Sequence, residues 1–173
     1  MEWTAFKTTA KVPVTGRFTS VQIQASEAPG QLPELLKGAT ASIDGMSVDS
    51  GNPVRDENVK KAFFALFEEK AAIKGKITRV EGDATRGRFD LEIRMNRQSN
   101  AVPMTYQVSD KAIEAIGKFD FLTFKGSKAL DSIHQLCLEL HKGADGVSKT
   151  WSEMGIKLTA PIERKCSSGA TGQ

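Results

Sequence analysis

Strict alternation of apolar and polar residues is the feature of this sequence that most limits how it can fold. It is clearest in residues 89–96, "FDLEIRMN", where every second residue is apolar. A period of two is that of a β-strand with one face buried and the other in water. Residues 102–108 repeat the pattern, and the polar stretch 97–100 between the two runs predicts the loop of an antiparallel hairpin.

Shorter blocks of the same alternation recur along the chain and bring the predicted number of strands to about eight. Turn signals such as Glu81-Gly82-Asp83 separate the blocks, at spacings too short for a helical crossover. The further blocks begin at Val12, Val21, Ala41, Ile73, Ile113, Phe119 and Met154. A sheet of this many strands hides its edges by closing, so we predict a mainly β fold, an antiparallel up-and-down barrel.

Two segments leave this rhythm and predict helices at about 57–67 and 129–141. From Val59 onward, the first carries apolar residues at i, i+4, i+7 and i+8, which form one stripe of an α-helix. Asp56 is placed to cap its amino end. The second segment carries a similar stripe and is followed by a Lys-Gly stop signal.

An Arg55-Asp56 pair stands where the first helix begins. We expect Asp56 to cap the helix, and Arg55 to pair with an acid or a carbonyl at the barrel rim and so hold the helix over the barrel end. The helix then brings Phe63, Phe64 and Phe67 toward the interior. Two interpretations remain open: a cap with ordinary core packing, or the lid of an apolar cavity.

Length and charge limit the classes of protein that the chain can belong to. Its 173 residues suit one domain, which we assign to residues 1–163, with a flexible tail over 164–173. Its 24 Lys and Arg against 21 Asp and Glu are too balanced for a dedicated nucleic-acid surface. No apolar run reaches the roughly 18 residues of a membrane span, and the amino terminus lacks the apolar core of a signal peptide. We expect a cytoplasmic protein, or a periplasmic or secreted one if a leader has been removed.

The segment "HQLCLELH" places His134, Cys137 and His141 on one side of the second helix. All three are competent metal ligands, but Cys137 also belongs to the apolar stripe, and Cys166 is a fourth ligand only if the tail folds back. We therefore predict no metal site and no cofactor. Whether Cys137 and Cys166 pair is left open, because they lack a diagnostic spacing. Motifs such as G-x-S-x-G and H-E-x-x-H are absent from the sequence, so we predict no catalytic residues.

Several short motifs follow one another in a fixed order between about residues 10 and 160. They are "VTGRF" (14–18), "SIDGMSVDSGNPVRDENVKKAFF" (42–64), "MNRQSNAVPMTYQV" (95–108) and "TWSEMGIKL" (150–158). In this order they resemble the YceI-like, polyisoprenoid-binding family of lipocalin-like barrels. Two departures stand out: Asn58 replaces a histidine found in many members, which removes a polar group that could contact a ligand head, and the hairpin near residue 96 lacks the family's glycines.

The resemblance implies an elongated apolar tunnel that takes a long isoprenoid or fatty-acyl chain. Methionine and phenylalanine are suited to lining such a tunnel, although they fill a solid core equally well. The candidate ligand-binding residues are Phe18, Met46, Phe63, Phe64, Phe67, Met95, Met104, Phe121, Phe124 and Met154.

The leading hypothesis is a binding protein, not an enzyme, that sequesters or carries such a lipid. Its affinity is expected to follow chain length and to depend little on the head group. An enzyme acting on a hydrophobic small molecule in the same cavity, with His134 or an interior carboxylate as acid or base, is the alternative. A filled barrel serving as an interaction module is a third reading, and a homodimer is left open.

Overall fold

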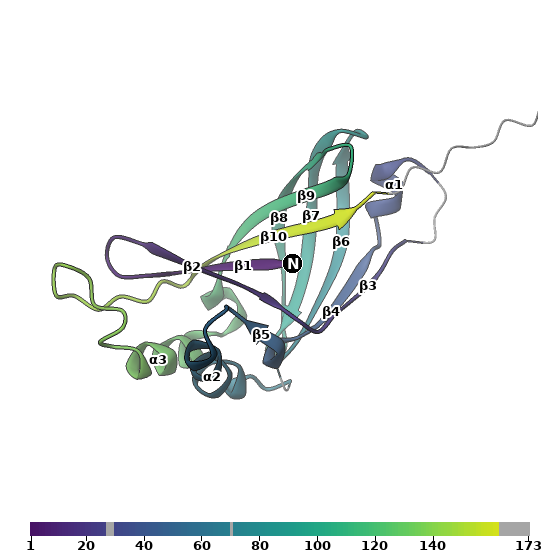
Figure 1. The fold of residues 1–173 in the computed structure, drawn as a ribbon. Helices are drawn as coiled ribbons and strands as arrows, with labels where there is room; N and C mark the ends of the chain where they lie inside the picture. Colours follow the sequence, from purple (N-terminus) through teal and green to yellow (C-terminus); the bar gives the residue numbers. More distant parts are fainter. Residues whose placement is uncertain (27–29, 70, 163–173) are drawn as a thin grey trace, which may run out of the picture.

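The computed structural model describes residues 1–26, 30–69 and 71–162, and within them ten strands form one curled antiparallel sheet (Figure 1). The strands are β1 (Glu2–Lys7), β2 (Val12–Phe18), β3 (Val21–Gln24), β4 (Thr40–Asp44), β5 (Val48–Asp49), β6 (Ala72–Gly82), β7 (Arg86–Met95), β8 (Gln98–Val108), β9 (Ala112–Asp120) and β10 (Glu153–Pro161). Their order in the sheet is β3-β4-β6-β7-β8-β9-β10-β1-β2-β5. The predicted fold class is confirmed. The blocks predicted at Ile113 and Phe119 form one strand, β9, and β1 and the two-residue β5 lie outside the predicted blocks. The predicted tail, 164–173, lies outside the described residues.

The sheet is curled because two consecutive strands, β2 and β3, lie near opposite ends of the strand order. The chain passes from β2, next to one end of the strand order, directly into β3 at the other end. At the corner between them, the Thr19 amide donates to the Ser47 carbonyl at 3.0 Å, and the Asp44 amide donates to the Ser20 carbonyl at 3.2 Å. The two ends of the sheet therefore meet at this corner, and the strands form a half-barrel.

Strands β7 and β8 behave as the alternation predicts, because their apolar residues are buried and their polar residues exposed. The hairpin between them is tighter than predicted. Strand pairing extends to Met95 and Gln98, so that only Asn96 and Arg97 form the turn. Both have positive φ, 49° and 57°, which is the backbone of a two-residue turn that matches the twist of the strands. The predicted loop over 97–100 is therefore wrong, since three of its residues belong to β8.

Three α-helices and three short 3₁₀ turns complete the described residues. The helices are α1 (Leu32–Leu36), α2 (Pro53–Ala62) and α3 (Ser127–Leu136), and the turns are η1 (Gly45–Ser47), η2 (Phe64–Leu66) and η3 (Phe121–Phe124). Helices α2 and α3 lie together beneath one end of the half-barrel, and α1 lies near the opposite end (Figure 1). None of the described helices is long and apolar enough to cross a membrane.

The predicted helices exist, but their bounds and one cap differ from the prediction. Helix α2 begins earlier because Asn52 caps it, accepting a hydrogen bond from the Arg55 amide at 3.1 Å, and Pro53 occupies the first turn. Asp56 lies inside the helix, so its predicted role as the cap is wrong. Helix α3 ends at Leu136, and the rest of its predicted span forms turns, in which the His141 amide donates to the Cys137 carbonyl.

Candidate ligand-binding cavity

A cavity of about 410 Å³ lies between the inner face of the half-barrel and helices α2 and α3. Its volume falls within the roughly 300–1,000 Å³ typical of small-molecule sites. Strands β1, β2, β7, β9 and β10 contribute to its walls, and both helices contribute from the other side. The arrangement follows from the curl of the sheet, because the two helices cover the open end without filling the space above them.

The inner part of the cavity is apolar and rich in aromatic rings. Phe63 stands between two neighbours, with its ring centroid 5.2 Å from that of Phe64 and 4.7 Å from that of Phe121. Ile93 and Met95 face the same space from the end of β7. The contacts among these rings give a wall with fixed shape, since aromatic pairs at such spacings stabilise one another beyond simple burial.

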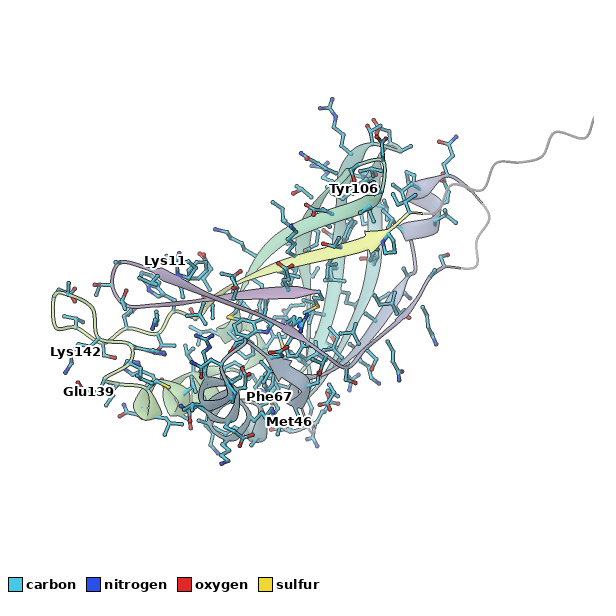
Figure 2. The ribbon with its side chains drawn as sticks, in the orientation of Figure 1. Lys11, Met46, Phe67, Tyr106, Glu139 and Lys142 are labelled. Carbon is cyan, nitrogen blue, oxygen red and sulfur yellow. The ribbon has the colours of Figure 1, made fainter. Side chains whose placement is uncertain are left out.

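Six of the ten candidate ligand-binding residues line this cavity, and four do not. Those that line it are Phe18, Phe63, Phe64, Met95, Phe121 and Met154. Phe67 and Phe124 are buried in the aromatic cluster behind the wall, with Phe67 5.4 Å from Phe63, and Met104 packs on Gly117 within the sheet. Met46 is exposed in η1, and Figure 2 labels it beside Phe67 near α2. Whether any of these side chains contacts a ligand stays a prediction.

Polar side chains that the sequence analysis did not nominate as ligand-binding also line the cavity, and all of them are partly or fully exposed. They are Lys7, Asn52, Arg55, Asn58, His141 and Thr150. Among the described residues that line the cavity, none is an aspartate or a glutamate. Asn52, Val54 and Leu140 are the exposed lining residues, so the mouth lies between the start of α2 and the chain that follows α3.

Arg55 and Asp56 are joined through Ser50, at the point where β5 leads into α2. The Arg55 guanidinium donates to the Ser50 hydroxyl at 2.7 Å and to the Ser50 carbonyl at 2.9 Å, so it reaches a carbonyl as predicted. The Asp56 carboxylate accepts from the amide and the hydroxyl of Ser50, at 2.9 and 2.5 Å. These bonds satisfy a buried carboxylate and fix the first turn of α2 at the cavity mouth.

His134 and His141 both contact the hydroxyl of Thr150, at Nδ1 to Oγ1 distances of 2.9 and 2.6 Å. Burial, helped by the positive charge of Lys7 and by His134, lowers the pKa of His141 below its ordinary value. His141 is therefore neutral at neutral pH. The Lys7 ammonium lies close by and donates to the Leu140 carbonyl at 3.3 Å. This cluster joins β1, α3 with the chain that follows it, and the segment that leads into β10.

The histidines and the cysteine of the "HQLCLELH" segment do not converge on one point in the described part of the chain. Across residues 1–26, 30–69 and 71–162, no three His, Cys, Asp or Glu side chains gather as ligands of one ion. Burial raises the pKa of the Cys137 thiol, which keeps it protonated and poorly reactive. Cys166 lies outside the described residues, so its pairing with Cys137 remains untested.

Comparisons with known proteins place this fold. The model of the YceI-like domain matches residues 2–159 of the chain. No curated protein sequence matches the chain. Among solved structures, the YceI protein of Campylobacter jejuni has a TM-score of 0.61 at 16% identity, covering 87% of this chain and 86% of that one. A polyisoprenoid binding domain from Saccharophagus degradans has a TM-score of 0.62 at 13% identity, covering 91% and 89%. BcnA of Burkholderia cenocepacia has a TM-score of 0.59 at 14% identity, covering 94% of this chain and 96% of that one.

Proposed function

The chain belongs to the YceI-like domain family, and we propose that it binds a long-chain, lipid-like molecule, an isoprenoid or a fatty-acyl chain, in the cavity above helices α2 and α3. The observation that carries the proposal is the division of the cavity wall. Every buried residue of the lining is apolar, and the lysine, the arginine and the amide side chains of the lining are all partly or fully exposed. An amphiphile fits this division with its chain inside and its polar head at the mouth.

Burial of the chain supplies the affinity in this proposal. Each methylene that leaves water for the cavity contributes about 0.8 kcal/mol. Three additional methylenes therefore tighten binding by about fiftyfold until the cavity is full. The proposal needs no chemical change in the ligand, and the protein acts by sequestering or carrying it. The solved polyisoprenoid binding domain of similar fold supports this choice of ligand class.

The experiment that tests the proposal has two parts. Native mass spectrometry of the purified protein is expected to show added mass that organic extraction removes and identifies as a long-chain lipid. Titration with a series of fatty acids and prenols is then expected to show affinity rising with chain length. A flat response to chain length, or tighter binding of short polar ligands, contradicts the proposal.

An enzyme remains the second candidate, and one observation favours it. The Thr150 hydroxyl lies 2.6 Å from His141 Nδ1 in the cavity wall, which is the distance between a hydroxyl nucleophile and its base. A hydrolase of fatty-acyl esters is the reaction class that such a pair supports. We rank it second because His134 contacts the same hydroxyl. Ester hydrolysis that Thr150→Val abolishes, with lipid binding retained, favours this candidate over simple carriage.

A further inference from the structure

Large apolar side chains are exposed around the cavity mouth. The mouth patch consists of Val12, Val54, Leu136, Leu138 and Leu140. Val54 and Leu140 line the cavity itself, yet they are 70% and 61% exposed. Val54 and Leu140 therefore expose apolar surface at the mouth itself, and exposed apolar surface beside a cavity marks an interaction site more often than an accident of composition.

Cavity-lining residues bring the parts of the mouth patch together. Asn58, in α2 with Val54, and Cys137, just before Leu138 and Leu140, line the same cavity. On the hairpin of β1 and β2, Val12 pairs with the cavity-lining Lys7, so both side chains point to the same face of the sheet.

A small excess of positive charge lies beside the mouth patch. The tip of the β1–β2 hairpin and the segment 136–152 lie side by side (Figure 1), joined by the Thr8 amide donating to the Lys149 carbonyl at 2.9 Å. Residues 5–12 and 136–153 carry four lysines against two glutamates and one aspartate, and Lys11 and Lys142 form ion pairs with Glu153 and Glu139, whereas no ion pair is formed by Lys7 or Lys149 within the described residues. Figure 2 labels Lys11, Glu139 and Lys142 at this end of the molecule.

The single indole at this end lies between two of these lysines. Lys11 Nζ is 4.9 Å and Lys149 Nζ is 5.1 Å from the ring of Trp151, which is partly exposed and donates from its Nε1 to the Thr8 carbonyl. Leucines beside tryptophan and lysine make up the composition that sits at the boundary between lipid head groups and acyl chains.

From these observations we infer that the mouth patch docks on an anionic lipid surface, where the ligand passes between the membrane and the cavity. The passage of ligand rests on the proposed function; the docking rests on the surface alone. A long chain that leaves a membrane through water exposes every methylene, at about 0.8 kcal/mol each. A mouth set directly on the membrane avoids that exposure, and the lysines select surfaces with negative head groups.

Flotation with lipid vesicles tests the docking. Vesicles of phosphatidylcholine are compared with vesicles that also contain phosphatidylglycerol. The protein is expected to float with the anionic vesicles at least tenfold more strongly, and added salt is expected to weaken that binding. Equal binding to both kinds of vesicle, or no binding to either, overturns the inference.

A pair of double variants locates the surface. Leu136→Asp with Leu138→Asp changes the mouth patch at two residues that do not line the cavity, and it is expected to lower vesicle binding by more than tenfold. Leu35→Asp with Ile116→Asp adds the same charge at exposed apolar residues of α1 and β9, and it is expected to leave vesicle binding within about twofold. Equal losses in the two variants overturn the inference.

Single lysines test the electrostatic part. Lys149→Gln is expected to weaken binding to the anionic vesicles about fivefold, because each lysine near such a surface contributes about 1 kcal/mol. Lys37→Gln, an exposed lysine just after α1, is the matched control and is expected to change nothing. Equal effects of the two changes contradict docking at the mouth.

Two further measurements separate this inference from the proposed function and from self-association. Binding of a soluble medium-chain fatty acid, measured without vesicles, is expected to be unchanged in Leu136→Asp with Leu138→Asp. If no variant binds the fatty acid but the vesicle results hold, the proposed function fails and the docking stands. If size-exclusion chromatography shows a lipid-free dimer that the mouth variant dissociates, the patch serves a second copy of this chain and the inference is overturned.

Discussion

The two ends of the half-barrel use the same kinds of side chain with opposite results. At the filled end, Tyr106 stacks on Phe89 at 6.2 Å, its hydroxyl donates to the Asp83 carbonyl at 2.8 Å, and Met104 packs nearby, all almost fully buried. At the hollow end, below which α2 and α3 lie, rings and methionines surround the cavity. Figure 2 shows Tyr106 at the filled end and Phe67 near the helices of the hollow end.

Glycines make room for large side chains at both ends, so they do not explain the difference. At Gly87 an added Cβ would meet the ring of Tyr106 at 2.6 Å, and at Gly117 it would meet the sulfur of Met104. At the hollow end Gly16, Gly45 and Gly126 leave room in the same way for the cavity-lining rings of Trp3, Phe64 and Phe121. At the hollow end, Met95 and Ile93 face the helices across the cavity. Whether a large apolar residue fills the core or lines the cavity thus depends on which groups lie opposite it.

Among the variants that compare the two ends, Tyr106→Ala is expected to lose the most stability. Removing a fully buried ring leaves a cavity that the surrounding strands cannot collapse into, which costs about 4 kcal/mol of unfolding free energy. Urea denaturation measures it. Tyr106→Phe is the control, since it loses only the hydrogen bond to Asp83 and is expected to cost about 1 kcal/mol. Similar costs for the two variants contradict a tightly packed filled end.

Adding volume is expected to affect the two ends differently. Val102→Phe overpacks the filled end and is expected to cost about 2 kcal/mol of stability. Ile73→Phe extends into the cavity, so it is expected to change stability by less than about 1 kcal/mol while weakening the binding of a long fatty acid by more than tenfold. Urea denaturation and ligand titration measure the two effects. A large loss of stability in Ile73→Phe shows that the hollow end is packed as tightly as the filled one.

The start of α2 offers a third, smaller test. Asp56→Ala removes two hydrogen bonds to a buried carboxylate and leaves the Ser50 amide without its acceptor, at a cost of about 2 kcal/mol. Asn52→Ala removes only the helix cap and is expected to cost about 1 kcal/mol. Thermal unfolding compares them. A larger cost for Asn52→Ala than for Asp56→Ala contradicts the role given to the hydrogen bonds between Asp56 and Ser50.

Acid is expected to weaken the two ends in different pH ranges. The pKa of His141 is lowered from 6.5, chiefly by burial, so the unfolded state takes up its proton first and stability falls as the pH drops below 6.5. The pKa of Asp83 is lowered from 3.8 to about 2, chiefly by a hydrogen bond from Thr85, so its contribution is lost only between these values. Hydrogen exchange followed by NMR is expected to show the cavity mouth loosening first. His141→Gln is expected to remove the upper step, and Asp83→Asn is expected to remove the low-pH loosening around Tyr106, while other carboxylates of lowered pKa, such as Glu153, keep their own low-pH effect. A single transition affecting both ends together contradicts this assignment.

Much of the fold could be predicted because it depends on short-range patterns. The alternation in residues 89–95 defines β7 and its buried face, since a period of two is a property of the backbone itself. Strand β1 was missed because Phe6 interrupts its alternation. The cap of α2 was misplaced because Asn52-Pro53 competes with Asp56 as a start signal, and the local sequence allows both.

The cavity is a feature that short-range sequence patterns do not predict. Met95 and Met104 are the same residue type on the buried faces of paired strands, yet one lines the cavity and the other fills the sheet. The polar mouth brings Lys7 together with His141 and Thr150, which are more than a hundred residues further along the chain. The sequence by itself determined the strand period, the two main helices and the supply of aromatic and sulfur-containing side chains, because these follow from interactions between near neighbours. Only the tertiary structure decided which of those side chains meet a partner and which face empty space, because that depends on groups brought together from distant strands.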